Sequence, residues 1–580
     1  MPVTPLLDVK NLTVRFRNDT QETIAVDTIS FSLRRSEILA IVGESGSGKS
    51  VTALSILGLI PYPPGRVSAK AITFEDASRG EVQLETLTEK EYQTIRGKSI
   101  SMIFQEPMTA LNPVFTCGDQ VSEPIRQHLG LSGKKARQRV LNLFEEVHLP
   151  DREKIFRSYP HELSGGQKQR VMIAMAISCD PLLLIADEPT TALDVSVQKT
   201  ILDLLKRLQQ NRKMSILYIT HDLGLIPHFA HRAMVMFQGK IVEQGPVDRI
   251  FHEPQHPYTR GLLACRPKSD VRLKRLPTVK EFLESGQTTV GSWQSEGKVP
   301  VFQEVVSREE RKVNHEQLYT RQPVLKVEHI SKQFSKRQGW LRPGKTITRA
   351  VDDMSFEVYP GETLGIVGES GCGKTTVSRV VLQLIPPTEG RIVYLNEDIS
   401  RLTYRKRRVL SKDLQIVFQD PYSSLNPRMT IGRALQEPMK VHNLYKNDRK
   451  RKERVAELLS KVGLDPEYVS RYPHEFSGGQ RQRICIARAL AVEPQLVICD
   501  EAVSALDVSI QAQILNLLND LKRELGLTYI FISHDLNVVK YMSDRLIVMK
   551  DGKIVEMGDP DEIYLNPKSE YTKMLLDANT

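Results

Sequence analysis

Mostly apolar short runs alternate with longer amphipathic stretches along the chain, in two similar blocks. The runs at 37–42 (EILAIV) and 362–367 (ETLGIV) are typical of buried strands. Each run leads into a glycine-rich loop and then into a stretch, 50–60 or 375–385, whose apolar residues recur at helical spacing. Strands that alternate with helices in this way predict an α/β fold with a largely parallel sheet flanked by helices in each block.

The two blocks are copies of one another. The segment YPHELSGGQKQR (159–170) returns as YPHEFSGGQRQR (472–483), LLLIADE (182–188) returns as QLVICDE (495–501), and YITHDL (218–223) returns as FISHDL (531–536). All three pairs keep one spacing, and so do the tail segments 256–263 and 569–576. Collinear repetition over this length indicates a duplicated domain.

A chain of 580 residues is too long for one hydrophobic core, since cores stop growing near roughly 250–300 residues. Between the copies, polar residues and turn formers show no sustained periodicity, which is typical of a linker. We therefore predict a first domain at 1–266 with a C-terminal extension, a linker at 267–323 and a second domain at 324–580.

Composition and charge place the chain among ordinary soluble proteins. It is 40% hydrophobic and 26% charged, and no apolar run approaches the ~18 residues of a membrane span. Asp8 and Lys10 interrupt the N-terminus early, unlike a secretory signal, so we expect a cytosolic location. The net charge of +10 arises partly from clusters at 404–408 and 448–454, which suit solvated faces or contact with anionic lipid headgroups or nucleic acid.

The six cysteines are scattered singly and show no C-x-x-C spacing. This spacing argues against a metal site or a disulfide framework, and we expect the cysteines to be small buried side chains.

Two glycine-rich loops, VGESGSGKS (42–50) and VGESGCGKT (367–375), match G-x-x-x-x-G-K-[ST]. Glycines let the backbone wrap a polyphosphate, so that N–H groups and a helix N-terminus point at it. Lys49 and Lys374 would reach the β and γ phosphates, while the hydroxyls of Ser50 and Thr375 would bind Mg²⁺. The alternative is a glycine-rich turn before a buried helix; the full motif, its context and its second copy favour phosphate. The predicted cofactor-binding residues here are Gly43, Glu44, Ser45, Gly46, Ser47, Gly48, Lys49, Ser50, Val51, Gly368, Glu369, Ser370, Gly371, Cys372, Gly373, Lys374, Thr375 and Thr376.

An apolar strand ends in paired acids in each half, followed by TALD or SALD. The first acid of each pair can bind Mg²⁺ and the second can polarise a water for attack on the γ phosphate. A histidine follows the next apolar run at matched spacing and is predicted to contact the γ phosphate, although a lone strand-end histidine is more often structural. A glutamine in IFQEP or VFQDP would complete the Mg²⁺ and water shell. The residues are Asp187, Glu188, His221 and Gln105 in the first half and Asp500, Glu501, His534 and Gln419 in the second.

A further anion-binding helix start precedes a basic helix in each half. Each half already has a phosphate loop, so we predict that each nucleotide is held between the loop of one half and this signature of the other. The residues are Ser164, Gly165, Gly166 and Gln167 in the first half and Ser477, Gly478, Gly479 and Gln480 in the second.

Taken in order and twice over, these motifs resemble a tandem ATP-binding subunit of an ABC transporter, and the resemblance covers everything except the linker. The segments EPMTALNPVFT, ADEPTTALDVSVQ, DPYSSLNPR, DEAVSALDVSIQAQI and HPYTRGLL look like the oligopeptide, dipeptide and nickel importer branch. The fused arrangement is similar to glutathione and microcin-type peptide importers.

The resemblance implies a RecA-like α/β core and a helical subdomain in each half, with ATP and Mg²⁺ as cofactors. It implies a peripheral position on the cytoplasmic face of the inner membrane, where the chain would drive two membrane permeases supplied by a solute-binding protein. Import follows from the resemblance alone. The resemblance favours a peptide, a dipeptide or glutathione as the solute, while opine-like compounds and nickel stay open. By the same resemblance Phe16 and Phe334 would stack on adenine; packing as apolar strand residues is the alternative for each.

Two departures from the family pattern bear on the chemistry. Unfused members of the branch often carry a cysteine cluster for an iron–sulfur centre after the H-P-Y-T region, but only Cys265 lies there, so we predict no cluster. Ala502 stands where the first half has Pro189, which alters the turn after the acids. Because neither half has lost an acid, lysine, signature serine or histidine, we predict two hydrolytic sites.

The alternative is that the chain is a soluble twin ATPase that acts on the ribosome or on nucleic acid. Its basic clusters would then contact the phosphate backbone of the nucleic acid. Such translation factors usually carry a long charged helical arm between the halves, and DNA-repair relatives carry zinc-binding cysteine pairs. The segment ESGQTTVGSW is poorly suited to such an arm, and the sequence has no C-x-x-C pair. We therefore predict transport and no nucleic-acid partner.

Overall fold

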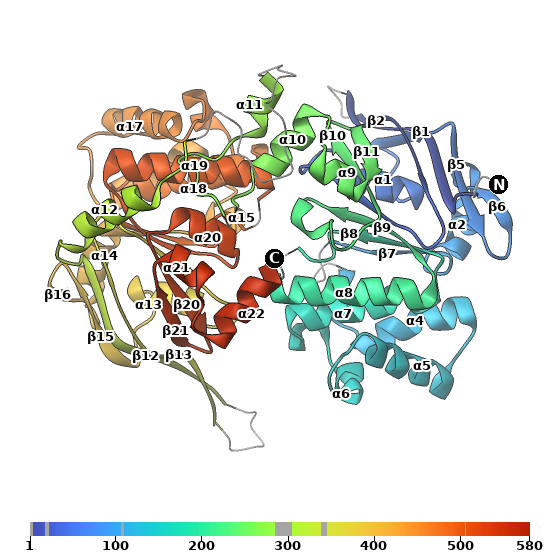
Figure 1. Ribbon diagram of the computed structural model, residues 1–580, viewed down its shortest axis with the longest axis horizontal. Helices are drawn as coiled ribbons and strands as arrows, with labels where there is room; N and C mark the ends of the chain where they lie inside the picture. Colours follow the sequence, from blue (N-terminus) through green and yellow to red (C-terminus); the bar gives the residue numbers. More distant parts are fainter. Residues whose placement is uncertain are drawn as a thin grey trace.

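The computed structural model describes residues 4–17, 22–105, 110–191, 193, 195–268, 270–284, 304–337, 345–504 and 506–579. Two similar halves lie side by side and inverted, so that helices α4–α7 are at the bottom of the view and helices α17 and α18 are at the top (Figure 1). In the described parts of the chain, no helix is long and apolar enough to cross a membrane.

Each half contains a mostly parallel sheet of six strands, as predicted. The order is β11-β10-β3-β9-β8-β7 in the first half and β17-β18-β19-β14-β20-β21 in the second; β11 and β21 run antiparallel to their neighbours. The bounds in the first half are β3 Ile38–Val42, β7 Ile100–Ile103, β8 Leu183–Asp187, β9 Ser215–Thr220, β10 Arg232–Phe237 and β11 Lys240–Pro246. In the second half they are β14 Thr363–Val367, β17 Leu414–Val417, β18 Leu496–Asp500, β19 Thr528–Ile532, β20 Arg545–Lys550 and β21 Lys553–Gly558.

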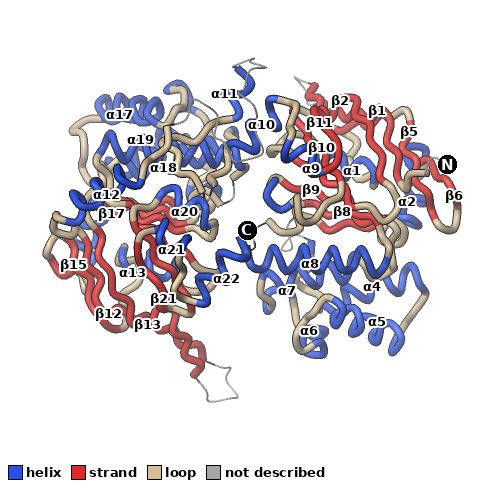
Figure 2. Tube along the Cα trace, in the orientation of Figure 1, coloured by secondary structure: helices blue, strands red, loops and turns tan. Residues whose placement is uncertain are grey.

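A second, antiparallel sheet in each half was not anticipated from the sequence pattern (Figure 2, where the strands of both kinds of sheet are red). Its long strands β1 and β12 pair with irregular register, and β1 has an irregular burial pattern, which blurs the strict alternation that would mark a strand. The strands of the first half are β1 Leu7–Arg17, β2 Glu22–Leu33, β4 Gly65–Ser68, β5 Ala71–Asp76 and β6 Gly80–Gln83. Those of the second half are β12 Leu325–Arg337, β13 Lys345–Val358, β15 Glu389–Tyr394 and β16 Glu397–Asp398.

Helices cover the sheets and form a cluster of their own between the glutamine segment and the signature of each half, where the helical subdomain was expected. The α-helices of the first half are α1 Lys49–Ile56, α2 Glu89–Ile95, α4 Cys117–Leu129, α5 Gly133–Glu146, α6 Arg152–Arg157, α7 Gly165–Ala176, α8 Val195–Arg212, α9 Val247–His252 and α10 Pro257–Ala264. Two more follow, α11 Val279–Glu284 and α12 Arg308–Tyr319. Those of the second half are α13 Lys374–Val381, α14 Tyr404–Asp413, α15 Pro421–Ser424, α16 Ile431–Val441, α17 Asp448–Lys461, α18 Gly478–Leu490, α19 Val508–Leu525, α20 Leu536–Met542, α21 Pro560–Leu565 and α22 Glu570–Asn579.

The helix after each glycine-rich loop is shorter than its apolar pattern predicts. Helix α1 ends at Ile56 and α13 at Val381, although the periodic stretches continue to 60 and 385. Just beyond these ends, Gly58 and Gln383 have φ angles of 60° and 57°. This left-handed backbone stops the helix even though the side chains that follow remain apolar.

Each half has its own apolar core between its antiparallel sheet and one face of its main sheet. All six cysteines are buried free thiols, which confirms the prediction that they are buried side chains.

The segment predicted as a linker folds in part, while 269 and 285–303 lie outside the described residues. It contains α11 and α12; α11 packs against α10 of the first half, while other described parts contact the second half. Arg272 donates to the carbonyl of Ser543 at 2.7 Å, and Arg311 pairs with Asp559 at 3.0 Å. The backbone N–H of Leu276 donates to Asn516 Oδ1 at 2.9 Å. These contacts tie the chain that leaves the first half to the body of the second.

Candidate functional site

The main sheet brings the predicted residues together at one edge. In the first half β3, β9 and β8 are parallel neighbours, so their C-terminal ends meet. The glycine-rich loop follows β3, Asp187 ends β8, and His221 follows β9. The second half repeats this order with β14, β18 and β19. The C-terminal edge of a parallel sheet is where open α/β folds bind ligands.

The predicted loops, Gly43–Val51 and Gly368–Thr376, form the turns from β3 into α1 and from β14 into α13. Gly48 has a φ angle of 100°, and a Cβ there would meet the carbonyl oxygen of Ala25 at 2.5 Å, so only glycine fits. Gly373 has a φ angle of 109° and faces the carbonyl of Ala350 in the same way. The loop shape therefore depends on glycine in both halves.

Both loop lysines are buried and fold back over their own loops. Lys49 Nζ donates to the carbonyls of Gly43 and Glu44 at 2.7 and 2.9 Å, and Lys374 Nζ donates to Gly368 and Glu369 at 2.6 and 3.0 Å. Burial lowers the pKa of Lys49, against the nearby charge of Glu188. An anion in the loop would relieve this desolvated charge.

Two of the three residues predicted to hold Mg²⁺ in each half have their oxygen atoms side by side, while the predicted glutamine contacts the neighbouring glutamate. Ser50 Oγ donates to Asp187 Oδ1 at 3.0 Å, and Thr375 Oγ1 lies 3.5 Å from Asp500 Oδ1. Burial raises the pKa of Asp187 to about 6 and also raises that of Asp500. A carboxylate and a hydroxyl side by side are donors that Mg²⁺ prefers, so these residues fit the ion.

Glu188 is the centre of a cluster at the end of β8. Its Oε2 accepts from Gln105 Nε2 at 3.0 Å and from Thr191 Oγ1 at 2.9 Å, and lies 3.0 Å from His221 Nδ1. Burial alone would raise the pKa of Glu188, but the hydrogen bond and charge of His221, together with Lys49 and Thr191, outweigh it and lower that pKa. Glu188 also has a φ angle of 47°, a strained conformation that aims its side chain at this cluster.

The second half repeats the cluster with longer contacts. Gln419 Nε2 donates to Glu501 Oε2 at 2.8 Å, and His534 Nδ1 lies 3.6 Å from the same oxygen. Glu501 has a φ angle of 51°, and its pKa is lowered by His534 against the opposing effect of burial. The structure thus brings glutamine, glutamate and histidine together twice, as the sequence predicted.

The Glu188–His221 contact makes stability depend on pH. Burial lowers the pKa of His221, but Glu188, with Asp507 and Asp222, outweighs burial and raises it above 6.5. Because the pKa of His221 is raised on folding, the stabilisation that it contributes is complete below pH 6.5 and is lost as the pH rises through the folded-state pKa. Because the pKa of Glu188 is lowered on folding, its contribution is complete above pH 4.5 and is lost as the pH falls through the folded-state pKa. We expect the melting temperature of the unmodified protein to exceed that of His221→Gln most between pH 4.5 and 6.5.

Differential scanning calorimetry across pH 5–8 measures this difference. His534→Gln is the matched control, and a smaller pH-dependent difference is expected there because its contact is 3.6 Å. A difference for His221→Gln that grows above pH 6.5 would contradict the ion pair.

Each signature begins a helix with a capping box. Ser164 Oγ accepts from the N–H of Gln167 at the start of α7, and Ser477 Oγ accepts from the N–H of Gln480 at the start of α18. Gly165, Gly166, Gly478 and Gly479 occupy the first helical turns. Among the described residues, no hydrogen bond joins Ser477–Gln480 to the Gly43 loop or Ser164–Gln167 to the Gly368 loop. The pairing of each loop with the opposite signature stays a prediction.

The Gly43 loop does contact the opposite half, through residues that the sequence analysis did not single out. Asp507 Oδ1 accepts from the backbone N–H of Ser45 at 3.0 Å and lies 3.3 Å from Ser45 Oγ. Ser509 Oγ hydrogen-bonds to the carboxylate of Glu44. Asp507 is the last residue of the SALD segment. The position of this segment after the paired acids was the sequence signal that could have identified Asp507 as a site residue. The second half therefore reaches the phosphate loop of the first.

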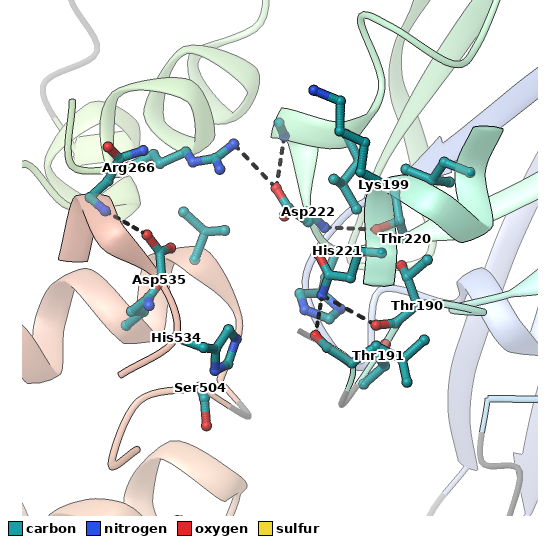
Figure 3. Close-up of a pocket in the computed structure, with 18 of the residues that line it drawn as sticks. Thr190, Thr191, Lys199, Thr220, His221, Asp222, Arg266, Ser504, His534 and Asp535 are labelled. Atoms are coloured by element: carbon teal, nitrogen blue, oxygen red, sulfur yellow. Dashed lines mark hydrogen bonds and ion pairs between the residues drawn. The ribbon is translucent and has the colours of Figure 1, made fainter. Parts of the chain in front are cut away.

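A cavity of about 990 Å³ lies between the halves. Thr190, His221 and Asp222 of the first half face Ser504, His534 and Asp535 of the second across it (Figure 3). Gln419 and Glu501 also line it. Residues of both glutamate clusters thus open into one shared space.

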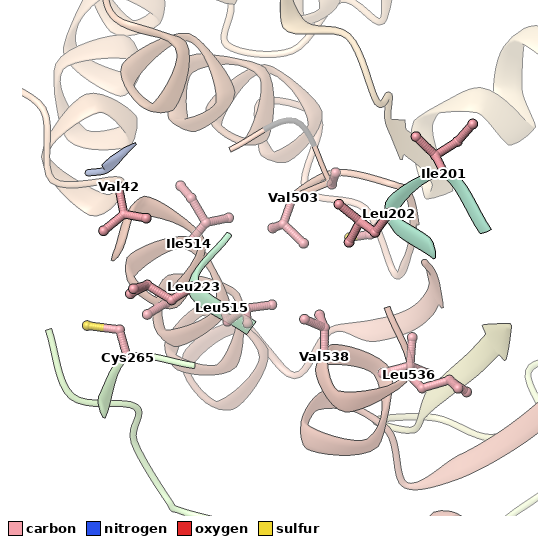
Figure 4. Packing of buried hydrophobic residues seen from close by; sticks show 14 of the residues in the cluster. Val42, Ile201, Leu202, Leu223, Cys265, Val503, Ile514, Leu515, Leu536 and Val538 are labelled. Carbon is pink, nitrogen blue, oxygen red and sulfur yellow. The ribbon is translucent and has the colours of Figure 1, made fainter. Parts of the chain in front are cut away.

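An apolar cluster joins the halves beside this cavity. Val42, Leu223 and Cys265 of the first half belong to the same cluster as Ile514 and Leu515 of α19 (Figure 4). Burial of apolar side chains from both halves stabilises their contact.

The two phenylalanines differ in their surroundings. Phe16 is half-buried on β1 against the core of the first half, while Phe334 on β12 exposes 46% of its surface. Phe16 therefore already has the role of an apolar strand residue. Stacking on adenine stays a prediction for both.

Comparison with known proteins identifies both halves. The model of the ABC transporter family matches residues 26–191 and 351–504. The model described as "Oligopeptide/dipeptide transporter, C-terminal region" matches 242–289, which includes α9, α10 and α11.

Curated relatives match almost the whole chain. The "Glutathione import ATP-binding protein GsiA" of Shigella dysenteriae and that of Escherichia coli K12 are each 46% identical over 99% of this chain and 89% of their own length. The protein of that name from Salmonella typhimurium is 45% identical over the same shares. A solved dimer of the ATP-binding cassette MJ0796, bound to ADP and Pi, is 28% identical over 41% of this chain and 98% of its own, with a TM-score of 0.36.

Proposed function

The chain belongs to the ABC transporter family, and from this premise we propose that it drives the import of a peptide-class solute, glutathione or a dipeptide foremost, through two membrane permeases. It is a transporter ATPase with two ATP-binding domains. The solute class is supported by the names of the GsiA relatives and by the match of 242–289 to the oligopeptide and dipeptide transporter region.

The observation that carries the proposal is the glutamate cluster. Glu188 lies within hydrogen-bond reach of both Gln105 and His221, beside the loop of Lys49. Glu501 likewise accepts from Gln419, with His534 at the longer distance of 3.6 Å. A positioned carboxylate next to a phosphate loop is what hydrolysis at a γ phosphate needs.

In this mechanism the ionised Glu188 accepts a proton from the attacking water, and Gln105 orients that water. His221, fixed by Glu188, donates to the γ phosphate, while Lys49 leaves the loop carbonyls to bind the β and γ phosphates. Bound Mg²⁺ would neutralise phosphate charge, and Ser50, Asp187 and Gln105 would hold it. Glu501, His534, Gln419, Lys374, Thr375 and Asp500 have the matching roles in the second site.

Both sites are proposed to hydrolyse ATP, because both keep the full set of residues. ATP would join the halves by contacting one loop and the opposite signature, and hydrolysis would release them. The contact of Asp507 with the Gly43 loop supports such a composite site.

The proposed partners are two permeases and a solute-binding protein, with the chain bound to the cytoplasmic face of the inner membrane. The test is to co-express it with its two permeases, to reconstitute the complex in liposomes and to add the solute-binding protein. Labelled glutathione and a labelled dipeptide should be taken up only with ATP, and a matched complex with Lys49→Ala and Lys374→Ala should take up neither. ATP hydrolysis without transport of any peptide-class solute would contradict the proposed import.

A further inference from the structure

A tyrosine from the C-terminal extension of each half reaches the phosphate loop of the same half. Tyr258 Oη accepts a hydrogen bond from the backbone N–H of Glu44 at 3.1 Å. Tyr571 Oη accepts from the backbone N–H of Glu369 at 3.2 Å. Tyr258 is fully buried and Tyr571 is 6% exposed. The same contact at the matching positions of both copies is a built feature of the site.

Each tyrosine is itself held firmly in place. It lies in the first turn of α10 or α22, where the N–H of Tyr258 donates to His256 Nδ1 at 3.2 Å and that of Tyr571 donates to Ser569 Oγ at 3.3 Å. The turn before each helix is anchored by a strand glutamate. Glu243 on β11 accepts the N–H groups of Gln255 and His256 at 2.8 and 3.1 Å, and Glu556 on β21 accepts those of Lys568 and Ser569 at 3.0 and 3.2 Å.

The tyrosine completes a two-sided hold on one residue of the loop. The N–H of Glu44 meets Tyr258, while its carbonyl accepts from Lys49 Nζ at 2.9 Å. The N–H and carbonyl of Glu369 are held likewise by Tyr571 and Lys374. When the lysine turns to phosphate, the carbonyls of Glu44 and Glu369 keep the backbone N–H groups of Ser47 and Cys372, at 3.1 and 3.2 Å. The tyrosine hydroxyl is the partner of the glutamate N–H itself, and a backbone N–H that loses its partner away from water is costly.

The helices that carry the tyrosines also touch the opposite half. Helix α10 packs against α19, the helix that follows Asp507, and α22 packs against α8, where Lys199 Nζ donates to the carbonyl of Asp577 at 2.8 Å. Figure 1 shows α22 reaching across to α8 at the centre of the molecule. The tyrosine helix therefore lies between the phosphate loop of its own half and the helix behind the acids of the other.

We propose that Tyr258 and Tyr571 are positioning residues that keep the phosphate loops in the shape that binds ATP. This inference rests on the proposed assignment of the two loops to ATP. It also assigns a role to the C-terminal extension: the extension supports the phosphate loop of its own half.

The test compares equilibrium ATP affinity in the hydrolysis-blocked background Glu188→Gln with Glu501→Gln. Tyr258→Phe with Tyr571→Phe keeps both rings, including the packing of Tyr258 on Phe237 at 4.2 Å between centroids, and removes only the hydroxyls. We expect ATP affinity to fall about tenfold, the size of effect of one hydrogen bond lost in a buried site. In the hydrolytic chain the KM for ATP should rise about tenfold with kcat changed less than about twofold.

Tyr529→Phe is the matched control, because Tyr529 is 1% exposed and its hydroxyl donates to the carbonyl of Leu518 at 3.1 Å, away from the loops. Tyr529→Phe should leave the ATP affinity unchanged, even if it lowers the melting temperature as much as the Tyr258→Phe and Tyr571→Phe pair does. Unchanged affinity in the Tyr258 and Tyr571 variants, or an equal loss in Tyr529→Phe, would overturn the inference.

If the double variant does not fold, each single variant should weaken one of the two ATP sites. If neither single variant weakened ATP binding at either site, the positioning role would again be overturned. A parent background that binds no ATP would instead refute the assignment of the loops.

Discussion

Glu188→Gln combined with Glu501→Gln should bind ATP and hold it, with turnover reduced by about 10²–10⁴-fold. Glutamine keeps the side-chain length and an oxygen that can accept from Gln105 and Thr191, so the loops and their lysines should stay in place. What it removes is the carboxylate that accepts the proton of water. The chain should therefore stop in an ATP-bound state with its halves together, measured as phosphate release and as retention of labelled ATP.

The two single variants calibrate this result. If both sites hydrolyse ATP, each single variant keeps one intact base, so its effect should be smaller than that of the pair. Rapid hydrolysis in the double variant would count against the assignment of the bases. If Glu501→Gln alone were inactive while Glu188→Gln kept wild-type activity, the protein would have one hydrolytic site.

An arginine substitution in one signature should weaken ATP binding at the phosphate loop of the opposite half. The substitutions are made in the Glu188→Gln and Glu501→Gln chain, which is expected not to hydrolyse ATP. With Ser477→Arg, a photoreactive azido-ATP should label the first half more weakly, and with Ser164→Arg it should label the second half more weakly. We expect about 10–100-fold weaker labelling, because a charge-assisted contact to phosphate is lost. A protease site inserted within 285–303 separates the halves after labelling.

The matched control is Ser307→Arg, which removes another N-cap, from α12, where Ser307 Oγ accepts from the N–H of Glu310 at 3.0 Å. This variant should leave both labels intact. Loss of label from the half that carries the mutated signature would refute the composite site. This outcome matters because the described cross-half contact at the Gly43 loop comes from Asp507 and Ser509.

The strands and loops were predictable because local pattern determines them. An apolar run followed by G-x-x-x-x-G-K-[ST] identifies β3 and its loop, and the observed strand Ile38–Val42 matches. The antiparallel sheets were missed because register shifts along β1 and β12 break the period of two. The end of α1 was misplaced because Gly58 turns left-handed within an apolar stretch.

The sequence by itself determined the duplication, the α/β class, the two phosphate loops and the residue types gathered around them, since each of these is written in local spacing that repeats. Tertiary structure alone decided which groups come within hydrogen-bond distance. Tyr258 is 214 positions from Glu44 along the chain, and Asp507 is 462 positions from Ser45. No local period reports contacts over such separations, because strand order, helix packing and the inverted arrangement of the halves create them.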